Sequence, residues 1–212
     1  PAWLLGLDMG PNPLSQLEDL LRDVELRPGD RVLDLGCGRG ATSVFLAREF
    51  GVAVTAADLW VSETELRATV GAAGVADRVN VVNADARALP FDDDAFDAVV
   101  SIDAFEYFGT DARFLPGLLR VVRPGGWIGM TTPALRPDPY QQPPPAAVVD
   151  AVGWEAAAWH APEWWVTHWK LTGLIEKVHA RLQDGAREDW LRWCRAAGEA
   201  EDSPVVTMLR SC

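Results

Sequence analysis

Three glycines and a series of aspartates are the residues in this sequence whose types and spacing could support chemistry. The stretch RVLDLGCGRG carries Gly36, Gly38 and Gly40 directly after an apolar run that contains Asp34. A glycine-rich turn between a strand and a helix presents backbone N–H groups and the helix N-terminus to a ligand. The stretch therefore predicts a cofactor-binding turn, and the remaining question is which cofactor it takes.

The glycine spacing alone leaves two kinds of cofactor open. The dinucleotide fingerprint G-x-G-x-x-G places its last glycine one residue later than this sequence, which has Ala41 there. Asp34 lies two residues before the first glycine, where a carboxylate would repel a pyrophosphate and attract an ammonium group. The turn favours a cofactor that is cationic at this end and disfavours a nicotinamide oxidoreductase.

Further aspartates follow the expected strands. Asp58 comes 24 residues after Asp34 (58 − 34), close to the interval for a ribose-binding acid, and Asp85 and Asp103 follow the next two apolar runs. Open parallel sheets bind ligands beyond the carboxyl ends of their strands. S-adenosylmethionine carries an ammonium, a sulfonium, a ribose diol and an adenine amine, and an acidic crevice suits each of them.

These residues need a scaffold that brings several strand ends together. Apolar runs predict strands at 32–35, 52–57, 79–83, 97–102 and 127–132. Helical patterns between and before them lie at 13–24, 41–50, 62–73 and 111–122, and RPGG at 123–126 reads as a tight turn. This alternation predicts an α/β fold, a doubly wound, mostly parallel sheet with helices on both faces.

The sequence changes character after Pro133. PALRPDPYQQPPP indicates a loop or extended linker, and a tryptophan-rich stretch follows between 154 and 169. The alternation over 174–182 predicts a sixth strand, and 188–197 looks helical. The end, SPVVTMLRSC, fits either a strand or the start of a helix.

The motifs, taken in order, resemble those of the class I S-adenosylmethionine-dependent methyltransferases of the small-molecule type. RVLDLGCGRG, TAADLW, VNADARALPFDDDAFDAVVSIDAF and LLRVVRPGGWI are similar to successive family motifs over roughly residues 28–133, and SIDAFEYFG also resembles the cyclopropane-synthase branch. The resemblance implies a Rossmann-like, seven-stranded sheet whose last strand is antiparallel. Only VVTML remains to form that strand, so we expect that it is missing, replaced or outside this chain.

The resemblance also implies a division of the chain and a set of cofactor residues. We expect one methyltransferase domain, 1–212, with a helical cap at 1–27, a cofactor-binding core at 28–133, a substrate-side insertion or lid at 134–170 and the C-terminal part of the fold at 171–212. The implied binding residues for S-adenosylmethionine are Asp34, Gly36, Cys37 and Gly38 at the methionine end, Asp58 on the ribose, Leu59, Asp85 and Ala86 around the adenine, and Ser101 and Asp103 beneath the sulfonium.

The substrate side offers fewer signals. Methyl transfer mainly requires a close, aligned acceptor, and it needs a base only if the acceptor keeps its proton until attack. The candidate bases are Glu106, His160 and His168, and the candidate substrate contacts are Tyr107, Trp164 and Trp165. The tryptophans fit equally a lid that packs on the sheet and a pocket for a planar or apolar acceptor. The opening stretch WLLGLDMGPNPL is expected to cover the cofactor.

Charge and cysteine usage narrow the partners. The formal net charge of −12, without a basic patch, disfavours nucleic acid. No apolar run suggests a membrane span, and the three cysteines (Cys37, Cys194 and Cys212) suggest neither a disulfide framework nor a metal site. We expect a cytoplasmic protein, and a homodimer stays open.

The sequence thus predicts an S-adenosylmethionine-dependent methyltransferase that acts on O, N or C of a small metabolite and releases S-adenosylhomocysteine. A macromolecular acceptor is disfavoured by the acidic charge. A sensor or accessory protein that binds S-adenosylmethionine without transferase activity is the alternative from another class.

Overall fold

A computed structural model describes residues 2–7 and 9–211, without the side chain of residue 2. The chain forms two compact units, Pro1–Thr131 and Thr132–Cys212. Their boundary lies close to residue 133, where the sequence predicts the end of the cofactor-binding core. The assignment of all 212 residues to one domain stays a prediction.

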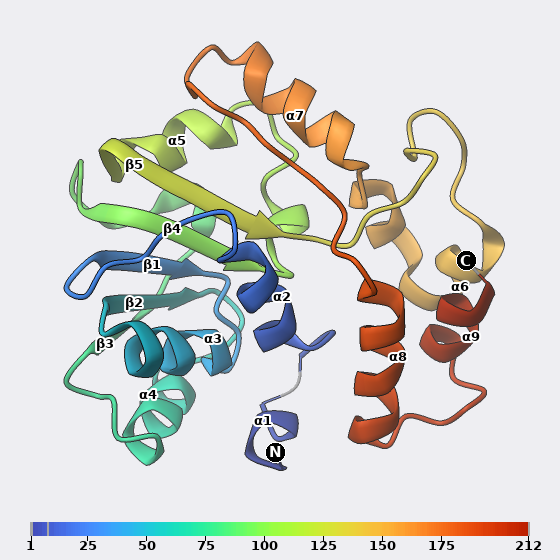
Figure 1. Cartoon of the computed structure of the whole chain (residues 1–212), viewed down its shortest axis with the longest axis horizontal. Helices are drawn as coiled ribbons and strands as arrows, with labels where there is room; N and C mark the ends of the chain where they lie inside the picture. The colour runs from blue at the N-terminus through green and yellow to red at the C-terminus, as the bar shows by residue number, and fades with distance from the viewer. Residues whose placement is uncertain (1, 8, 212) are drawn as a thin grey trace. The chain divides into compact units, whose positions relative to one another are not determined.

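The first unit is built around a five-stranded parallel sheet in the order β3-β2-β1-β4-β5. Figure 1 shows these strands side by side. Their bounds are Arg31–Leu35 for β1, Ala53–Asp58 for β2, Val79–Asn83 for β3, Phe96–Ile102 for β4 and Val122–Thr131 for β5. The strand order reverses between β1 and β4, and ligands of such sheets bind at this reversal. The predicted α/β fold is confirmed.

Helices flank this sheet. They are α1 (Ala2–Leu5), α2 (Pro13–Leu20), α3 (Ala41–Phe45) with its π-helical extension η1 (Leu46–Phe50), α4 (Glu63–Ala72), α5 (Phe114–Arg120) and the short 3₁₀ turns η2 (Ala86–Ala88) and η3 (Phe105–Tyr107). Helix α4 packs beside β3 and α5 beside β5 (Figure 1). Two of these helices start at a side-chain cap: Asn12 accepts from the N–H of Ser15 before α2, and Ser62 from that of Glu65 before α4.

The core lies on both faces of the sheet. Val32, Val54 and Val100 pack in one cluster with residues of α2, α3 and α4. Leu33 and Val99, one position along their strands, are also fully buried. Because successive strand side chains point to opposite faces, this alternation requires apolar cover on each face.

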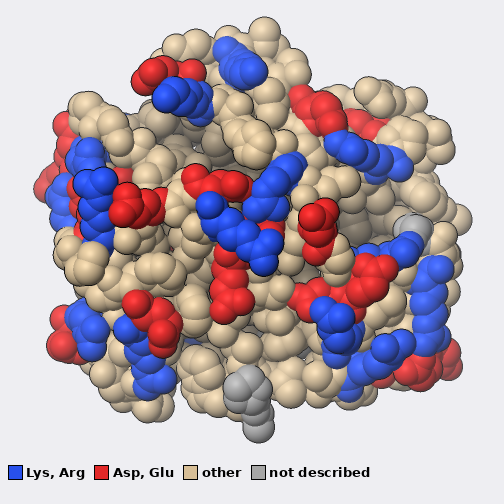
Figure 2. Space-filling model, in the orientation of Figure 1, with Lys and Arg blue, Asp and Glu red and all other residues tan. Residues whose placement is uncertain are grey.

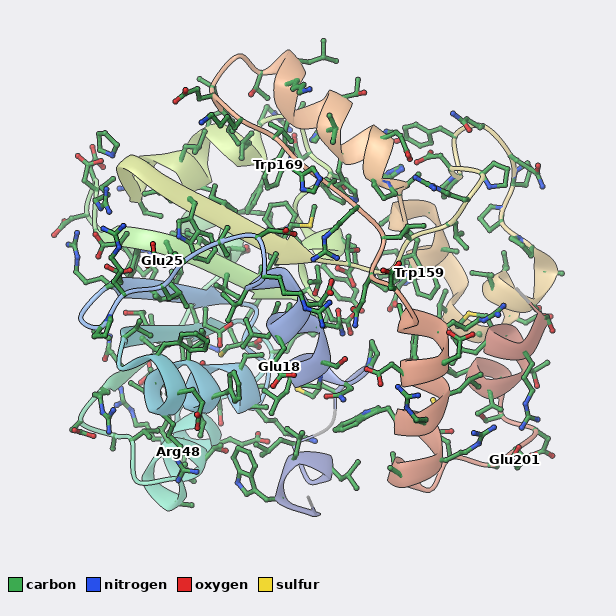
Figure 3. All side chains as sticks on the ribbon, in the orientation of Figure 1. Glu18, Glu25, Arg48, Trp159, Trp169 and Glu201 are labelled. Atoms are coloured by element: carbon green, nitrogen blue, oxygen red, sulfur yellow. The ribbon has the colours of Figure 1, made fainter. Side chains whose placement is uncertain are left out.

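The second unit is helical. It contains α6 (Ala146–Val152), the 3₁₀ turn η4 (Gly153–Ala158), α7 (Pro162–Leu171), α8 (Ala186–Ala197) and α9 (Pro204–Ser211). Helix α6 packs against α9, and buried side chains of both join Trp159, labelled in Figure 3, and Cys194 in one cluster. This unit therefore has an apolar core of its own.

One strand prediction in this unit is wrong, and one stretch that fitted either a strand or a helix is a helix. Residues 174–182 form no strand, and Leu174 and Leu182 are 52% and 46% exposed. The ambiguous C-terminal stretch is helix α9, which starts at Pro204 after Ser203 accepts the N–H of Val206. Within the described residues the sheet thus has no sixth or seventh strand, and Cys212 lies outside them.

The expected RPGG turn is part of a strand. Strand β5 starts at Val122 and runs through the two glycines, with a register shift against β4 between Phe96 and Ala98. A Cβ on Gly126 would lie 2.7 Å from the Asp97 carbonyl oxygen, so only glycine allows this close approach. The sequence showed the glycines but not that the neighbouring strand continues beside them.

The surface charges are mixed. On the face drawn in Figure 2, Lys and Arg side chains lie among Asp and Glu side chains. Arg31 and Arg123 both pair with Asp97, for example. Among the described helices, none combines the length and the apolar character needed to cross a membrane.

Candidate active site

A cavity of about 220 Å³ opens in the first unit. Its wall includes Gly36–Gly38 after β1, Asp58–Trp60 at the end of β2, Asp85–Arg87 after β3 and Ile102–Ala104 at the end of β4. Since parallel strands share one carboxyl edge, four separate segments of the sequence meet here. The predicted binding edge is therefore hollowed and lined by the expected aspartates.

The turn after β1 has backbone conformations that favour glycine. Gly36 and Gly38 have φ values of +72° and +52°, and a Cβ on Gly36 would lie 2.5 Å from the Cβ of Ala104. Between the two glycines, burial raises the pKa of the Cys37 thiol well above its usual range, helped by the nearby Asp34 and Asp58. The thiol stays protonated, which fits a small filler of the turn and not a nucleophile.

Asp58 ties the turn to the end of β2. Its Oδ2 accepts the N–H of Gly38 at 2.9 Å, and its Oδ1 accepts the N–H groups of Trp60 and Val61 at 2.8 and 2.9 Å. The residue is 7% exposed and lines the cavity. Because each carboxylate oxygen accepts two hydrogen bonds, Oδ2 keeps capacity for a ligand hydroxyl.

Asp34 lies behind the turn and is not part of the cavity wall. Its Oδ2 accepts from the hydroxyls of Thr42 at 2.7 Å and Ser43 at 2.5 Å, at the start of α3. Burial raises its pKa to about 6, although the two hydroxyls oppose this shift. The carboxyl group therefore fixes the start of α3, and a direct contact with the methionine end, as the resemblance implied, does not follow from this position.

Ser101 is a second predicted cofactor residue outside the wall. It is fully buried in β4, and its hydroxyl has no hydrogen-bond partner among the described residues. Asp103, two residues on, does line the cavity and has a φ of +53°, a value that is rare for a residue with a side chain. Such strained conformations cluster at functional sites.

The charged side chains of the cavity wall carry a net negative charge. Its charged side chains are Asp58, Asp85, Asp103, Arg39 and Arg87. Both arginines are already paired, Arg39 with Glu65 at 3.0 Å and Arg87 with Asp85 at 2.7 Å. Hydrogen bonds from the Arg87 side chain hold the pKa of the Asp85 carboxyl below its usual range. The wall therefore suits a cationic ligand better than a pyrophosphate.

Two of the predicted substrate-side residues, Glu106 and Tyr107, follow β4, and only Tyr107 lines the cavity. Tyr107 lines the cavity, where its ring meets that of Trp60 edge to face at a centroid distance of 5.0 Å. Its neighbour Glu106 is 4% exposed and does not line the cavity. The position of Tyr107 fits a contact with cofactor or substrate, and that of Glu106 does not.

The N-terminal segment contributes to the wall, and its role as a cover for the cofactor stays a prediction. Met9, Gly10, Pro11 and Pro13 line the cavity beside Leu7. Residue 8, which falls in the same predicted cover, lies outside the described residues.

The other predicted substrate-side residues belong to the second unit. His160 is 1% exposed and stacks on Trp164, with ring centroids 3.6 Å apart and planes 9° apart. His168 stacks on the same indole at 4.5 Å and 16°. Trp165 is buried and meets Trp164 edge to face at 4.9 Å. Because these residues are four positions apart, the rings of His160, Trp164 and His168 form one stack that starts just before α7 and continues on it.

Sequence reasoning missed three residues of interest. Trp60 directly follows the predicted Leu59, and Arg87 follows Ala86, so their adjacency to predicted positions was an available signal. The carboxylate of Asp138 lies within hydrogen-bond distance of Nδ1 of His160. Asp138 lies in the proline-rich stretch that was read as a linker. No local pattern links it to a histidine 22 residues away.

Comparison with known proteins matches the geometry. Residues 32–126 match a family described as "Methyltransferase domain". Over these residues the resemblance seen in the sequence is confirmed, and the fold is the Rossmann-like fold of the class I S-adenosylmethionine-dependent methyltransferases.

Individual relatives share this region. The chain is 33% identical over 120 residues to "Methyltransferase GfsG" of Streptomyces halstedii, which covers 56% of this chain and 43% of the relative. It is 46% identical over 102 residues to "Demethylmenaquinone methyltransferase" of Clavibacter sepedonicus, covering 47% and 40%. The chain thus spans less than half of the length of either relative.

A solved structure extends the likeness beyond the core. The S-adenosylmethionine-dependent methyltransferase from Geobacter sulfurreducens, in complex with S-adenosyl-L-homocysteine, is 26% identical, with a TM-score of 0.59. The match covers 96% of this chain and 81% of that one.

Proposed function

We propose that this chain is a methyltransferase that uses S-adenosylmethionine to methylate O, N or C of a small molecule. The observation that carries the proposal is the cavity at the carboxyl edge, whose wall combines the glycine turn with three aspartates. The bound cofactor would supply an electrophilic methyl group on its sulfonium. The names of the relatives and the cofactor in the Geobacter structure support the same activity.

The residues divide between binding and orientation. The backbone of Gly36–Gly38 would hold the methionine end, Asp58 would accept the ribose hydroxyls, and Leu59 would pack on the adenine. Asp85 is already engaged by Arg87, so it would share its lone pairs with the adenine amine. Among the described residues of the wall, Arg39 and Arg87 are both paired with carboxylates, which argues against a pyrophosphate and so against a dinucleotide.

Glu106, His160 and His168 are the proposed candidates for the proton acceptor of an O–H or N–H substrate, and Tyr107, Trp164 and Trp165 are the proposed substrate contacts. Burial lowers the pKa of the His160 imidazole, against the effect of Asp138, so the ring is neutral at neutral pH. Glu106 and His160 are 4% and 1% exposed, and neither lines the cavity of the first unit. Tyr107 is the one of these residues that does line it.

Calorimetric titration of the wild-type chain and Asp58→Ala with S-adenosylmethionine, S-adenosylhomocysteine and NADH tests the cofactor. We expect micromolar binding of the first two and a loss of about 100-fold in the variant, because hydrogen bonds to a charged group contribute about 1.5–3 kcal/mol each. Asp111→Ala is the matched control: Asp111 also accepts the N–H two residues on, that of Arg113, but lies outside the wall.

Turnover separates an enzyme from a binding protein. Release of S-adenosylhomocysteine is measured with a panel of small phenols, hydroquinones and secondary amines. Binding of NADH alone would overturn the proposal, and binding of S-adenosylmethionine without turnover of any acceptor would favour the sensor alternative.

A further inference from the structure

Two aromatic side chains from different strand ends meet at the wall of the cavity. Trp60 follows the end of β2, Tyr107 lies in the 3₁₀ turn after β4, and both line the cavity. Their rings meet edge to face, with centroids 5.0 Å apart and planes 69° apart. Because β1 lies between β2 and β4, the two strand ends are separated by two strand spacings, about 10 Å. The ring pair therefore bridges the carboxyl end of β1, where the glycine turn starts.

Hydrogen bonds to Asp58 hold Trp60 beside that turn. Asp58 Oδ1 accepts the N–H of Trp60 at 2.8 Å, and Oδ2 accepts the N–H of Gly38 at 2.9 Å. One carboxylate thus joins the segment that carries the tryptophan to the turn after β1. The proposed ligand of this carboxylate is the ribose of the cofactor, and that of the turn is its methionine end. In that pose the sulfonium, which joins these two parts, lies in the region that the ring pair bridges.

The faces of both rings can attract a cation. An aromatic face carries a negative potential, and indole binds cations more strongly than the other aromatic side chains do. A ring that meets a neighbour edge to face uses at most one of its two faces, so each ring keeps a face for a ligand. Trp60 is also 67% exposed, so most of its surface is accessible to a molecule that fills the cavity.

We propose that Trp60 and Tyr107 recognise the sulfonium charge, so that the cavity discriminates S-adenosylmethionine from its neutral product. Methyl transfer breaks the bond between the methyl carbon and sulfur, and the electron pair stays on sulfur, which becomes a thioether. S-adenosylhomocysteine therefore loses this attraction and keeps the other contacts, which favours its exchange for fresh cofactor. Tyr107 keeps its proposed contact with the acceptor, which must lie next to the same methyl group. This inference rests on the proposed function and assigns a role to Trp60, which sequence reasoning did not identify.

The carboxylates of the wall also favour a cation, but their contribution can be separated from that of the rings. Asp58, Asp85 and Asp103 attract any positive charge in the cavity, and they stay in place when a ring is replaced. A cation–π contact needs the charge within about 6 Å of the ring centroid and over its face. Replacing a ring by an aliphatic side chain therefore isolates the aromatic contribution to the discrimination.

Calorimetric titration with S-adenosylmethionine and S-adenosylhomocysteine measures this discrimination as the ratio of two dissociation constants. Trp60→Leu keeps an apolar side chain and removes the aromatic face. It should weaken binding of S-adenosylmethionine about fivefold more than binding of S-adenosylhomocysteine, the size of a cation–π contact at a partly exposed site. Tyr107→Leu should change the ratio in the same direction. Trp60→Phe and Tyr107→Phe keep a ring and should restore most of the wild-type ratio.

Product inhibition gives a second measurement, with the acceptor that the wild-type chain methylates fastest. In Trp60→Leu the KM for S-adenosylmethionine should rise, while the inhibition constant of S-adenosylhomocysteine stays within about twofold of the wild-type value. The ratio of the two constants should therefore rise by about the same factor as in the titration. A loss of packing at the cavity wall would weaken both ligands alike and would leave this ratio unchanged.

Phe91→Leu is the matched control. Phe91 meets Phe96 edge to face at the same centroid distance, 5.0 Å, but neither residue lines the cavity. The control should leave the ratio of dissociation constants within about twofold of the wild type. Equal losses for both ligands in Trp60→Leu and Tyr107→Leu would overturn the inference and leave the proposed cofactor site intact. A wild-type chain that binds neither ligand would overturn the proposed function as well.

Discussion

The two units hold buried carboxylates by the same means and direct them at different targets. Asp58 in the first unit receives three backbone N–H groups and still lines a cavity. Asp138 in the second receives two and faces an imidazole. Hydrogen bonds from backbone N–H groups offset the free-energy cost of burying either carboxylate. The group that contacts the remaining lone pairs then determines what each carboxylate can do.

The scaffolds behind these carboxylates also differ. Asp58 ends a strand that is paired on both sides, with β1 and β3. The described part of the second unit has helices and an apolar cluster in which Trp159 is the largest buried side chain. Substitutions in this cluster should therefore affect the two units unequally.

Trp159→Ala should produce the largest effect on stability. The side chain is 5% exposed, and removing a buried tryptophan costs about 3–5 kcal/mol through lost burial and the cavity left behind. The free energy of unfolding is measured by urea denaturation. Trp154→Ala is the matched control, since that side chain is 74% exposed and should change the free energy of unfolding by less than about 0.5 kcal/mol.

Amide hydrogen exchange tells where the loss falls. If the two cores are separate, exchange should rise in α6 and α9 of Trp159→Ala, while β1 and β4 keep their protection. An equal rise in the strands would contradict the distinction between the two cores.

The same contrast explains what the sequence could predict. In the first unit, apolar runs, Asn12-Pro13 and Ser62 are local signals, and local geometry decides where those elements start. In the second, residues 174–182 alternate like a strand, but a strand also needs a neighbour to pair with. Alternation cannot show whether one exists, and Leu174 is in fact exposed.

The site follows the same rule. Asp58, Asp85 and Asp103 were predictable because parallel strands share a carboxyl edge, so position after a strand is enough. The pairing of Asp138 with His160 was not, because it depends on how a loop folds back on α7. Asp34 was also predicted to bind the cofactor, but its carboxylate accepts from hydroxyls on α3 and lies behind the cavity wall.

Asp34 predicts how the stability of the first unit depends on pH. Its pKa rises from 3.8 to about 6 on folding, mainly through burial. The folded state therefore binds the proton more tightly, and stability falls as pH rises between these values. Relative to Asp34→Asn, the wild type should lose about 2 kcal/mol of unfolding free energy from pH 4 to pH 7.

Urea denaturation at both pH values measures this difference, and Asp97→Asn controls for its sign. Hydrogen bonds from Arg31 and Arg123 outweigh burial and lower the pKa of Asp97, so its carboxylate stabilises the fold more as pH rises. The wild type should therefore gain stability relative to Asp97→Asn mainly as the pH rises to about 4, and unlike the Asp34 pair it should lose none from pH 4 to pH 7. A difference between wild type and Asp34→Asn that does not vary with pH would show that Asp34 ionises as easily as in the unfolded chain.

The difference between Gly36→Ala and Gly29→Ala is the smallest of these effects and separates backbone strain from crowding at the cavity. Gly36 and Gly29 both have positive φ, +72° and +88°, but an added Cβ meets Ala104 at 2.5 Å at the first and nothing within 4 Å at the second. Both variants carry the strain of a left-handed alanine, about 1–2 kcal/mol. Gly36→Ala should lose about 1–3 kcal/mol more in urea denaturation, because the Cβ overpacks the turn against β4. Equal losses of unfolding free energy in the two variants would mean that the turn shifts to accommodate the methyl group. The cavity wall would then be less rigid than its contacts imply.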